Sequence, residues 1–277
     1  MDVRYLPNDV AYQRMTTREL RDAFVLENLF QPDRITLVYS DIDRAIVGGA
    51  VPVAGSLALR ATQKEMAAQY FNERRELGVM NLGGEGAVEV DGTHNVLGMK
   101  DLLYVGRGAR SIAFSSSDEA VPALFYLVSF PAHAPCPTAL MRFGEAERSP
   151  LGSADRANRR TIHKYVHAGG IKSCQLVMGM TELEEGSVWN TMPPHTHQRR
   201  SEIYLYFALE PEAMVVHLMG KPAETRNLIL RNRQAVLSPP WSIHAAAATK
   251  NYAFVWAMGG ENQEFSDMDA VSPGDLL

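Results

Sequence analysis

The sequence predicts an all-β protein of two barrels or sandwiches preceded by a short helical segment. Short apolar or alternating runs follow one another at regular spacing and are separated by Gly, Asp and Asn. The pair Asp91-Gly92 is typical of the tight turn of a β-hairpin. The chain has 277 residues, which suits about two domains. It contains neither a P-loop nor a Gly-x-Gly-x-x-Gly turn, which disfavours a nucleotide-binding α/β fold.

The elements can be placed in order along the chain. A helix is expected over residues 17–29, because Thr16 and Glu19 can form a capping box and Leu20, Phe24 and Val25 share one side. Strands are expected at 34–39, 45–53, 77–82, 87–90 and 102–105, and again at 161–166, 174–180, 201–207, 213–219, 235–237 and 252–258. The polar stretch 144–159 is expected to separate the halves. These observations predict an N-terminal extension (1–33), a first barrel (34–145) and a second barrel (158–277).

Composition restricts the class of partner. The formal net charge of −5 and the pI near 5.9 provide no general attraction to nucleic acid or to anionic membranes. No apolar segment follows Met1-Asp2-Val3-Arg4, so no signal peptide is expected. The most apolar stretch, 120–132, contains two prolines and is too short to span a bilayer. A cytoplasmic protein without nucleic-acid or membrane partners is the expectation.

One constellation points to a metal. His195 and His197 are one residue apart, so on an extended strand both side chains point the same way. Glu202 opens the next predicted strand, and His244 follows a turn forced by two prolines. Three imidazoles and one carboxylate are a ligand set that divalent transition metals accept. The sequence therefore predicts one metal site made of these four residues.

This pattern resembles the metal signature of the cupin superfamily, in which a His-x-His pair and a glutamate are followed by a later histidine. Within that superfamily the chain is similar to the 5-keto-4-deoxyuronate isomerases, also called 4-deoxy-L-threo-5-hexosulose-uronate ketol-isomerases. The similarity extends over nearly the whole chain. The segments that carry it are Trp189-Asn190-Thr191-Met192-Pro193, Trp241-Ser242-Ile243-His244, Gly260-Glu261-Asn262-Gln263, Tyr39-Ser40-Asp41-Ile42-Asp43-Arg44, Gly48-Gly49 and Glu73-Arg74-Arg75-Glu76-Leu77-Gly78.

The resemblance implies a bicupin, with two barrels of the jelly-roll type, and a zinc-dependent aldose–ketose isomerase (an intramolecular oxidoreductase). Its reaction would convert 4-deoxy-L-threo-5-hexosulose uronate to 3-deoxy-D-glycero-2,5-hexodiulosonate during pectin and uronate breakdown. One Zn²⁺ per chain is the implied cofactor, with Fe²⁺ and Mn²⁺ as alternatives, acting as a Lewis acid without redox change. The family also implies a homohexamer acting on a small keto-uronate.

The two halves are similar to each other in sequence. The run Arg74-Arg75-Glu76-Leu77 parallels Arg199-Arg200-Ser201-Glu202, and Arg110 is expected at the position that His244 occupies in the second half. Neither Arg110 nor the residues before Glu76 can replace an imidazole at a zinc-type site. The first barrel is therefore predicted to hold no metal, with chance similarity of short strands as the competing interpretation.

Three residues are candidates for proton transfer. Tyr204 and Tyr206 share a strand face with Glu202, so both are expected to point into the second barrel. Each could donate to an oxyanion, although inward aromatic residues commonly serve only for packing. Glu261 is a candidate base, with a solvated turn as the competing interpretation.

A substrate carboxylate requires a cation. Arg160 and Lys164 alternate onto one strand face, and Arg200 lies between the predicted ligands. Trp241 precedes His244 in one of the segments that carry the resemblance and is taken as a further substrate contact. Solvation at the surface is the competing interpretation for each cation.

Two other functions remain open at this point. Ferrous dioxygenases of the cupin superfamily use the same ligand types, so the ligands alone permit oxygen chemistry. A bicupin that binds sugars without catalysis is the second alternative.

Overall fold

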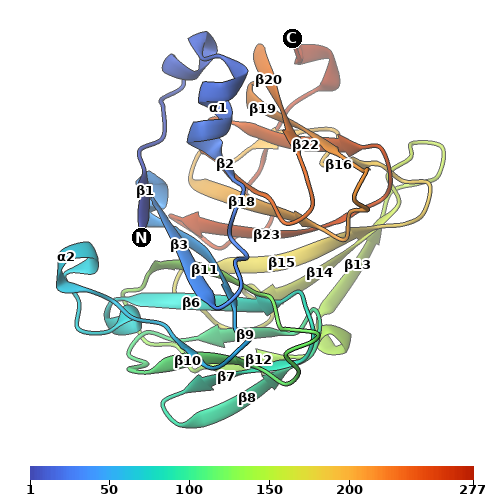
Figure 1. Cartoon of the computed structure of the whole chain (residues 1–277). Helices are drawn as coiled ribbons and strands as arrows, with labels where there is room; N and C mark the ends of the chain where they lie inside the picture. The colour runs from blue at the N-terminus through green and yellow to red at the C-terminus, as the bar shows by residue number, and fades with distance from the viewer. The chain divides into compact units, whose positions relative to one another are not determined.

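The computed structural model describes residues 1–277, which form two compact units. The first unit comprises Met1–Arg4, Asn28–Ala146 and Tyr165–Val177, and the second comprises Tyr5–Glu27, Glu147–Lys164 and Met178–Leu277. The division differs from the predicted ranges, because the expected extension 1–33 is shared between the units and residues 165–177 belong to the first. Strands dominate both units, which confirms the all-β prediction (Figure 1). No helix is long and apolar enough to cross a membrane.

The first unit contains a seven-stranded and a four-stranded sheet. The larger has the order β1 (Asp2–Arg4), β3 (Arg34–Ser40), β4 (Ile46–Val51), β11 (Phe125–Pro131), β6 (Arg75–Asn81), β9 (Leu102–Val105) and β12 (Ala139–Met141). The smaller has the order β5 (Leu57–Ala58), β10 (Ile112–Ser116), β7 (Gly86–Val90) and β8 (Thr93–Leu97). Side chains of β6, β9, β10 and β11 form a buried apolar core, which includes Leu77, Val79, Leu103, Phe114 and Phe125.

The second unit repeats this arrangement. Its larger sheet has the order β13 (Glu147–Leu151), β14 (Arg160–Val166), β15 (Val177–Leu183), β23 (Ala253–Gly260), β18 (Arg200–Phe207), β21 (Ala235–Ser238) and β2 (Val25–Leu26). The smaller has the order β16 (Trp189–Asn190), β22 (Ile243–Ala248), β19 (Val215–Lys221) and β20 (Glu224–Leu230). The four-stranded sheets match position by position, and the central strands β3, β4, β11, β6 and β9 match β14, β15, β23, β18 and β21, which supports the predicted internal repeat. The outer strands differ: β1 pairs parallel and β13 antiparallel, and β2 comes from the N-terminal segment whereas β12 follows β9 in the chain.

Helical structure is confined to short pieces. The two α-helices are α1 (Thr17–Phe24) and α2 (Gln63–Met66). The 3₁₀ turns are Ala11–Arg14, Ile42–Arg44, Phe71–Glu73, Phe143–Glu145 and Pro273–Asp275.

The N-terminal helix is shorter than the sequence suggested. Thr16 and Glu19 form the predicted capping box, and Leu20 and Phe24 are buried. The helix ends at Phe24, because Val25 and Leu26 continue as β2, which pairs antiparallel with β21. β-branched Val25 suits an edge strand better than a last helical turn. The predicted helix end at residue 29 was therefore wrong.

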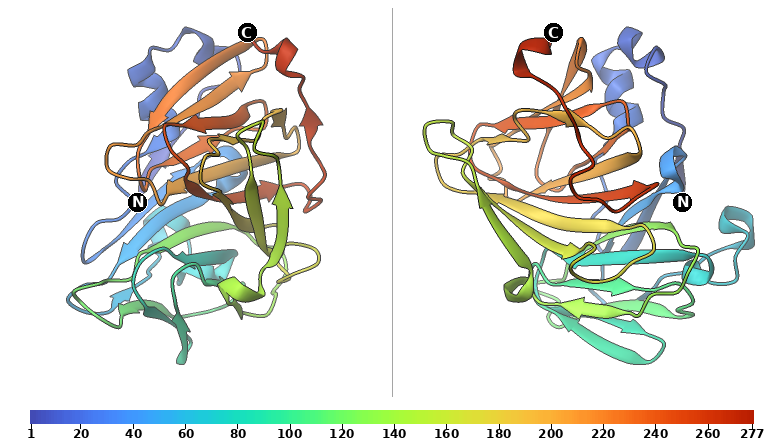
Figure 2. Two further views of the ribbon diagram at one scale, coloured as in Figure 1. Left: turned by 90° about the vertical axis from the view of Figure 1, so that its right-hand side faces the viewer. Right: turned by 180° about the vertical axis from the view of Figure 1, so that it is seen from behind.

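Residues 261–271, which we call the C-terminal strap, are fastened to the chain around the histidine pair. β24 (Asp269–Ala270) in the strap pairs antiparallel with β17 (His195–Thr196), and the red end of the chain in Figure 2 shows this course. Arg199 Nε donates to both carboxylate oxygens of Asp267, each at 2.8 Å. Arg200 donates to the backbone oxygens of Glu264 at 2.7 Å and Asp267 at 2.8 Å. These contacts set the position of the strap.

Close packing of β15 against β23 leads to a first prediction. A Cβ added at Gly179 would lie 2.3 Å from Cζ2 of Trp256 and 2.4 Å from the backbone oxygen of His163. Overpacking of this kind costs about 1–3 kcal/mol. We therefore expect Gly179→Ala to lower the urea midpoint of unfolding. Gly55→Ala is the matched control, since an added Cβ meets no atom within 4 Å there. Equal midpoints for the two variants would show that the sheet yields freely at Gly179.

The strap contact leads to a pH-dependent prediction. Hydrogen bonds from Arg199 and then Asn262 hold the pKa of the Asp267 carboxyl well below its usual range. A depressed pKa in the folded protein stabilises it above the unfolded pKa of about 4, and this contribution falls as pH drops below that value. In metal-free protein, Asp267→Asn should lower the urea midpoint at neutral pH, and the difference from the parent should shrink near pH 3.

The control for this prediction is Asp269→Asn, because Asp269 contacts Arg199 only at 3.2 Å. Its effect should be smaller than that of Asp267→Asn. A difference for Asp267→Asn that stays constant between neutral pH and pH 3 would contradict the assigned pairing.

Candidate metal centre

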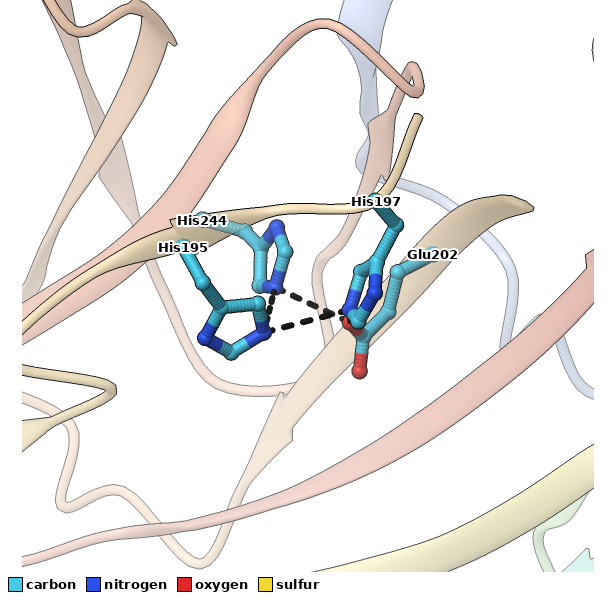
Figure 3. Close-up of side chains that lie close together, drawn as sticks. All are labelled: His195, His197, Glu202 and His244. Carbon is cyan, nitrogen blue, oxygen red and sulfur yellow. Dashed lines mark hydrogen bonds and ion pairs between the residues drawn. The ribbon is translucent and has the colours of Figure 1, made fainter. Parts of the chain in front are cut away.

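Three strands bring the four predicted ligands to one point inside the second unit. His195 lies on β17, His197 directly follows it, Glu202 lies on β18 and His244 lies on β22. His195 and His197 point the same way because one residue separates them on extended backbone. Figure 3 shows the three imidazoles and the carboxylate facing one another.

The distances within this group are short. His195 Nε2 lies 3.1 Å from His197 Nε2 and 3.0 Å from His244 Nε2. One carboxylate oxygen of Glu202 lies 2.9 Å from the Nε2 atoms of both His197 and His244. All four ligand atoms lie within 4.8 Å of one another, and His197, Glu202 and His244 are buried.

Burial and charge act in opposite directions on these groups. Burial, together with the neighbouring His244, lowers the pKa of His195 to about 3, so this imidazole is neutral at pH 7. Burial also acts to lower the pKa of His197, but the hydrogen bond and charge of Glu202 outweigh it and the net shift is upward. The pKa of Glu202 lies well below its usual range, because the attraction of His244 and His197 outweighs the cost of burial. The site thus keeps its carboxylate ionised.

The donor set fits a divalent transition metal. Neutral imidazole nitrogens offer lone pairs, and such lone pairs repel one another at about 3 Å unless a proton or a cation lies between them. The spacing suits a cation bound at roughly 2.0–2.2 Å from each ligand atom. Three nitrogens and one carboxylate oxygen form a set typical of zinc and of other first-row metals.

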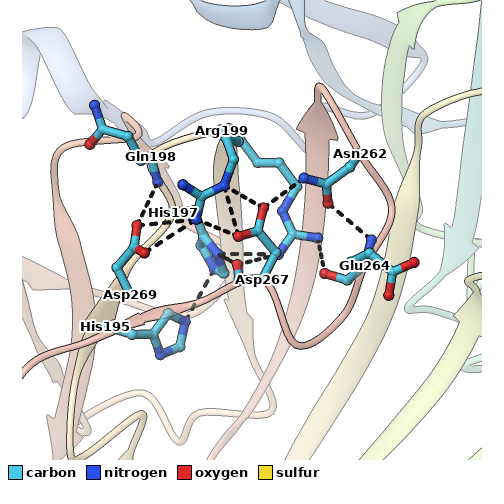
Figure 4. Close-up of polar contacts among 9 residues, drawn as sticks. His195, His197, Gln198, Arg199, Asn262, Glu264, Asp267 and Asp269 are labelled. Atoms are coloured by element: carbon cyan, nitrogen blue, oxygen red, sulfur yellow. Dashed lines mark hydrogen bonds and ion pairs between the residues drawn. The ribbon is translucent and has the colours of Figure 1, made fainter.

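The C-terminal strap orients the histidines from behind. His197 Nδ1 donates to the backbone oxygen of Asp267 at 2.8 Å, which leaves Nε2 free to bind a metal (Figure 4). Arg200 donates to the same carbonyl oxygen and is fully buried. His244 Nδ1 has a longer contact of 3.4 Å with Ser238 Oγ. Such partners of ligating histidines fix the ring tautomer and its orientation.

A pocket of about 220 Å³ opens onto the group. His195, His197 and Glu202 form part of its lining, as does Tyr204. Much of the remaining wall is apolar and includes Phe254, Trp256, Met258, Phe265 and Met268. Arg160 is the only cationic side chain in the lining. Only one of its guanidinium nitrogens has a partner within the protein, the backbone oxygen of Asn158 at 2.9 Å.

The structure separates the two candidate tyrosines. Both point into the barrel, but only Tyr204 lines the pocket, where its hydroxyl lies 3.2 Å from Thr191 Oγ1. Tyr206 is fully buried, and its hydroxyl bonds His217 Nδ1 at 2.7 Å. Burial raises the pKa of both phenols well above the usual value, so both are protonated at neutral pH. Glu261 is exposed and lies outside the pocket lining, because its backbone pairs with Arg199 at the start of the strap.

Only one of the four candidate substrate contacts lines the pocket. Arg160 does, whereas Lys164 pairs with Glu147 at 2.7 Å. Arg200 is buried beneath the strap, since its guanidinium satisfies backbone carbonyls. Trp241 stacks on Tyr12 at 4.6 Å between ring centroids. The structure therefore does not place Lys164, Arg200 and Trp241 at the pocket.

Sequence reasoning missed several pocket residues. Thr191, Phe265 and Met268 had no assigned role, although Thr191 lies in one of the segments that carried the family resemblance. Phe265 and Met268 belong to the strap, whose sequence has no periodic pattern. No sequence signal indicated that this segment folds back onto the site.

The equivalent positions in the first unit carry no ligand set. Two-residue turns join β7 to β8 and β19 to β20, so these hairpins can be matched residue by residue. Through their pairing with the next strand, Phe114 occupies the position of His244. The expectation that Arg110 stands there was wrong, because Arg110 precedes β10 and lies over the Tyr70 ring. Phe114 is buried in the apolar core.

Glu76 serves a different purpose from Glu202. It lies on the face of β6 opposite Leu77 and Val79, which belong to the barrel core. Its carboxylate accepts a hydrogen bond from the Tyr104 hydroxyl at 2.6 Å. It also accepts from the backbone N–H groups of Cys174, Gln175 and Leu176 at 2.7–2.8 Å. These four donors occupy the carboxylate and fasten residues 174–176 to β6.

Solved structures resemble this fold. An IolB-like protein from Salmonella typhimurium aligns with a TM-score of 0.73 at 13% identity, covering 90% of this chain and 96% of that one. An oxalate decarboxylase of Bacillus subtilis aligns with a TM-score of 0.54 at 13% identity, covering 79% and 70%. These similarities concern the fold, and they agree with the predicted bicupin.

Relatives in sequence are much closer. The 4-deoxy-L-threo-5-hexosulose-uronate ketol-isomerase of Shouchella clausii is 50% identical over 276 residues, and that of Caldicellulosiruptor bescii is 49% identical over 276 residues, each covering 100% of both chains. The enzyme of the same name from Pectobacterium carotovorum is 47% identical over 277 residues. The sequence model of the KduI/IolB family matches residues 28–272. This chain therefore belongs to the KduI/IolB family.

Proposed function

We propose that this protein is an aldose–ketose isomerase that converts 4-deoxy-L-threo-5-hexosulose uronate to 3-deoxy-D-glycero-2,5-hexodiulosonate. The observation that carries the proposal is the pocket itself, whose lining combines His195, His197 and Glu202 of the ligand group with a single arginine and mostly apolar walls. Such a pocket suits a small, acidic, oxygen-rich substrate. Relatives about half identical over their full length bear the name of this ketol-isomerase.

We further propose that His195, His197, Glu202 and His244 hold one Zn²⁺ per chain, with Fe²⁺ and Mn²⁺ as the alternatives. When bound, the metal would act as a Lewis acid that polarises neighbouring carbonyl and hydroxyl oxygens of the substrate. The support is the convergence of the four ligand atoms and the hydrogen bond that fixes the His197 tautomer.

The chain's own residues divide the remaining work. Arg160 binds the substrate carboxylate, because it is the only cation in the lining and only one of its guanidinium nitrogens is hydrogen-bonded within the protein. The protonated Tyr204 hydroxyl donates to the oxygen on which negative charge develops while a proton is transferred from the hydroxyl-bearing carbon to the neighbouring aldehyde carbon. Phe254, Trp256, Phe265 and Met268 exclude water from that oxygen. Tyr206 supports the barrel through His217.

The biological setting is part of the same proposal. Resemblance to the isomerase family suggests a homohexamer that acts in the cytoplasm during pectin and uronate breakdown. Light scattering of the purified protein tests the assembly, and a mass six times that of the 30.6 kDa chain is the expected result.

Removal of a ligand tests the metal and the function together. His197→Ala and His244→Ala should each lose stoichiometric metal, measured by elemental analysis of protein purified without added metal, and should lose isomerase turnover in parallel. The control is His94→Ala, since His94 is exposed on β8 and should retain both.

Retention of full metal by either variant would remove that residue from the ligand set. Substrate-dependent oxygen uptake by an iron-loaded protein would instead favour the dioxygenase alternative. Tight uronate binding without turnover in metal-replete protein would favour a sugar-binding function.

Arg160→Gln should raise KM at least tenfold and change kcat less, because it removes a charge-assisted contact made by the bound substrate. The matched control is Arg159→Gln, since Arg159 is half exposed and lies outside the pocket lining. An unchanged KM in steady-state isomerase assays would show that Arg160 does not bind the substrate carboxylate.

Replacement of the two tyrosines by phenylalanine should have different effects on kcat. Tyr204→Phe should lower kcat on the order of a hundredfold while metal content stays stoichiometric, because an oxyanion donor is lost. Tyr206→Phe should reduce kcat much less and should mainly lower stability, since His217 loses its buried partner. Equal kcat values for the two variants would restrict Tyr204 to packing.

A further inference from the structure

The largest cavity described in the first unit is unrelated to the metal centre. It measures about 450 Å³ and is bordered by Tyr39 on β3, Ile46 on β4, Phe71 and the start of β6. Two segments that carried the family resemblance, residues 39–44 and 73–78, meet at this cavity. Neither segment contributes to the metal centre.

Arg75 is the unusual member of the lining. Its side chain is only 8% exposed, and its three hydrogen bonds go to neutral oxygen atoms. Nε donates to Ser129 Oγ at 3.0 Å, and Nη2 donates to the backbone oxygens of Arg44 and Ser129 at 2.6 and 2.8 Å. Nη1 has no partner within the protein. Burial lowers the pKa of this guanidinium to about 10, so it remains charged at neutral pH.

The corresponding arginine of the second unit, Arg200, has a hydrogen-bond acceptor that Arg75 lacks. Arg75 opens β6 and Arg200 opens β18, the matching strand. Arg200 Nη1 donates to the backbone oxygen of Glu264 in the C-terminal strap. No strap segment accepts from Arg75 Nη1 in the first unit. The two N–H donors of Arg75 Nη1 are therefore available to an acceptor in the cavity.

The other polar groups around the cavity add to the positive charge. Lys64, Arg74 and Arg75 are the cationic side chains of the lining, and Glu65 is the only acidic one. Glu65 is already occupied by the terminal ammonium group at 2.6 Å and by Thr62. Tyr39 also lines the cavity, and its hydroxyl makes no hydrogen bond within the protein. It is therefore available to a ligand.

We infer that this cavity is a binding site for a small oxyanion, held by Arg75, Arg74 and Tyr39. The class includes the carboxylate of a sugar acid and inorganic phosphate, which planar guanidinium groups bind with paired N–H donors. The volume is in the range of small-molecule sites. This site lies beyond the proposed isomerase pocket and does not depend on its metal.

Calorimetric titration of the full-length, metal-loaded protein tests the inference with two probes, inorganic phosphate and D-glucuronate. We expect saturable binding that weakens at least tenfold in Arg74→Gln and also weakens in Tyr39→Phe, because each variant removes a donor. Both residues avoid the risk that Arg75→Gln fails to fold. Isomerase turnover of both variants should equal that of the parent.

Two matched controls separate this site from other effects. Arg60→Gln removes the same charge from the first unit outside the cavity lining, and Arg160→Gln removes the cation of the isomerase pocket. Neither should weaken phosphate binding. Binding of glucuronate alone with this dependence would identify a sugar acid, and binding of phosphate alone would identify a phosphate ligand.

The inference is overturned if neither probe binds up to about 10 mM, which corresponds to less than roughly 3 kcal/mol of affinity. It is also overturned if Arg60→Gln weakens binding as much as Arg74→Gln does. Failure of the isomerase assay leaves this test unaffected, since the readout is anion binding in the first unit.

Discussion

The second unit is organised around one constraint, the meeting of three imidazole nitrogens and a carboxylate oxygen about 3 Å apart inside a barrel. Groups that repel one another when neutral, and that cost free energy when buried and charged, remain together only if a rigid scaffold positions them. β17, β18 and β22 each supply a ligand from a different part of the chain. The His197 ring is held by a hydrogen bond to the backbone oxygen of Asp267 in the C-terminal strap, so the centre also depends on residues outside the pocket lining.

The two units show how one scaffold supports different chemistry. Their central strands follow the same order, yet Phe114 lies where His244 lies. Leu77 and Val79 face the core on β6, while Glu202 and Tyr204 face the pocket on β18. Apolar side chains fill the first barrel and stabilise it by burial. The buried charged groups of the first unit lie outside this apolar core: Glu76 accepts hydrogen bonds from residues 174–176, and Arg75 borders the cavity.

The isomerase pocket combines mostly apolar walls with a few polar groups. Apolar walls lower the local dielectric, so a single guanidinium and a protonated phenol act more strongly than they would in water. Arg160 and Tyr204 lie in the same pocket lining as His195, His197 and Glu202. Tyr206 lies on the same strand face but outside the pocket lining, and its hydroxyl is hydrogen-bonded to His217 Nδ1.

The sequence by itself determined the all-β class, the internal repeat, the capped helix start and the four residues that converge. Each depends on local periodicity, turn chemistry or spacing, which short-range sterics impose on any chain with this pattern. Only the tertiary structure decided that Val25 and Leu26 leave the helix to complete a sheet. It also decided that Arg200 is buried beneath the strap and that Trp241 stacks on Tyr12, so that neither lines the pocket. It also decided that Phe265 and Met268 reach the pocket from the strap. These outcomes depend on contacts between residues far apart in the chain, which local sequence patterns do not predict.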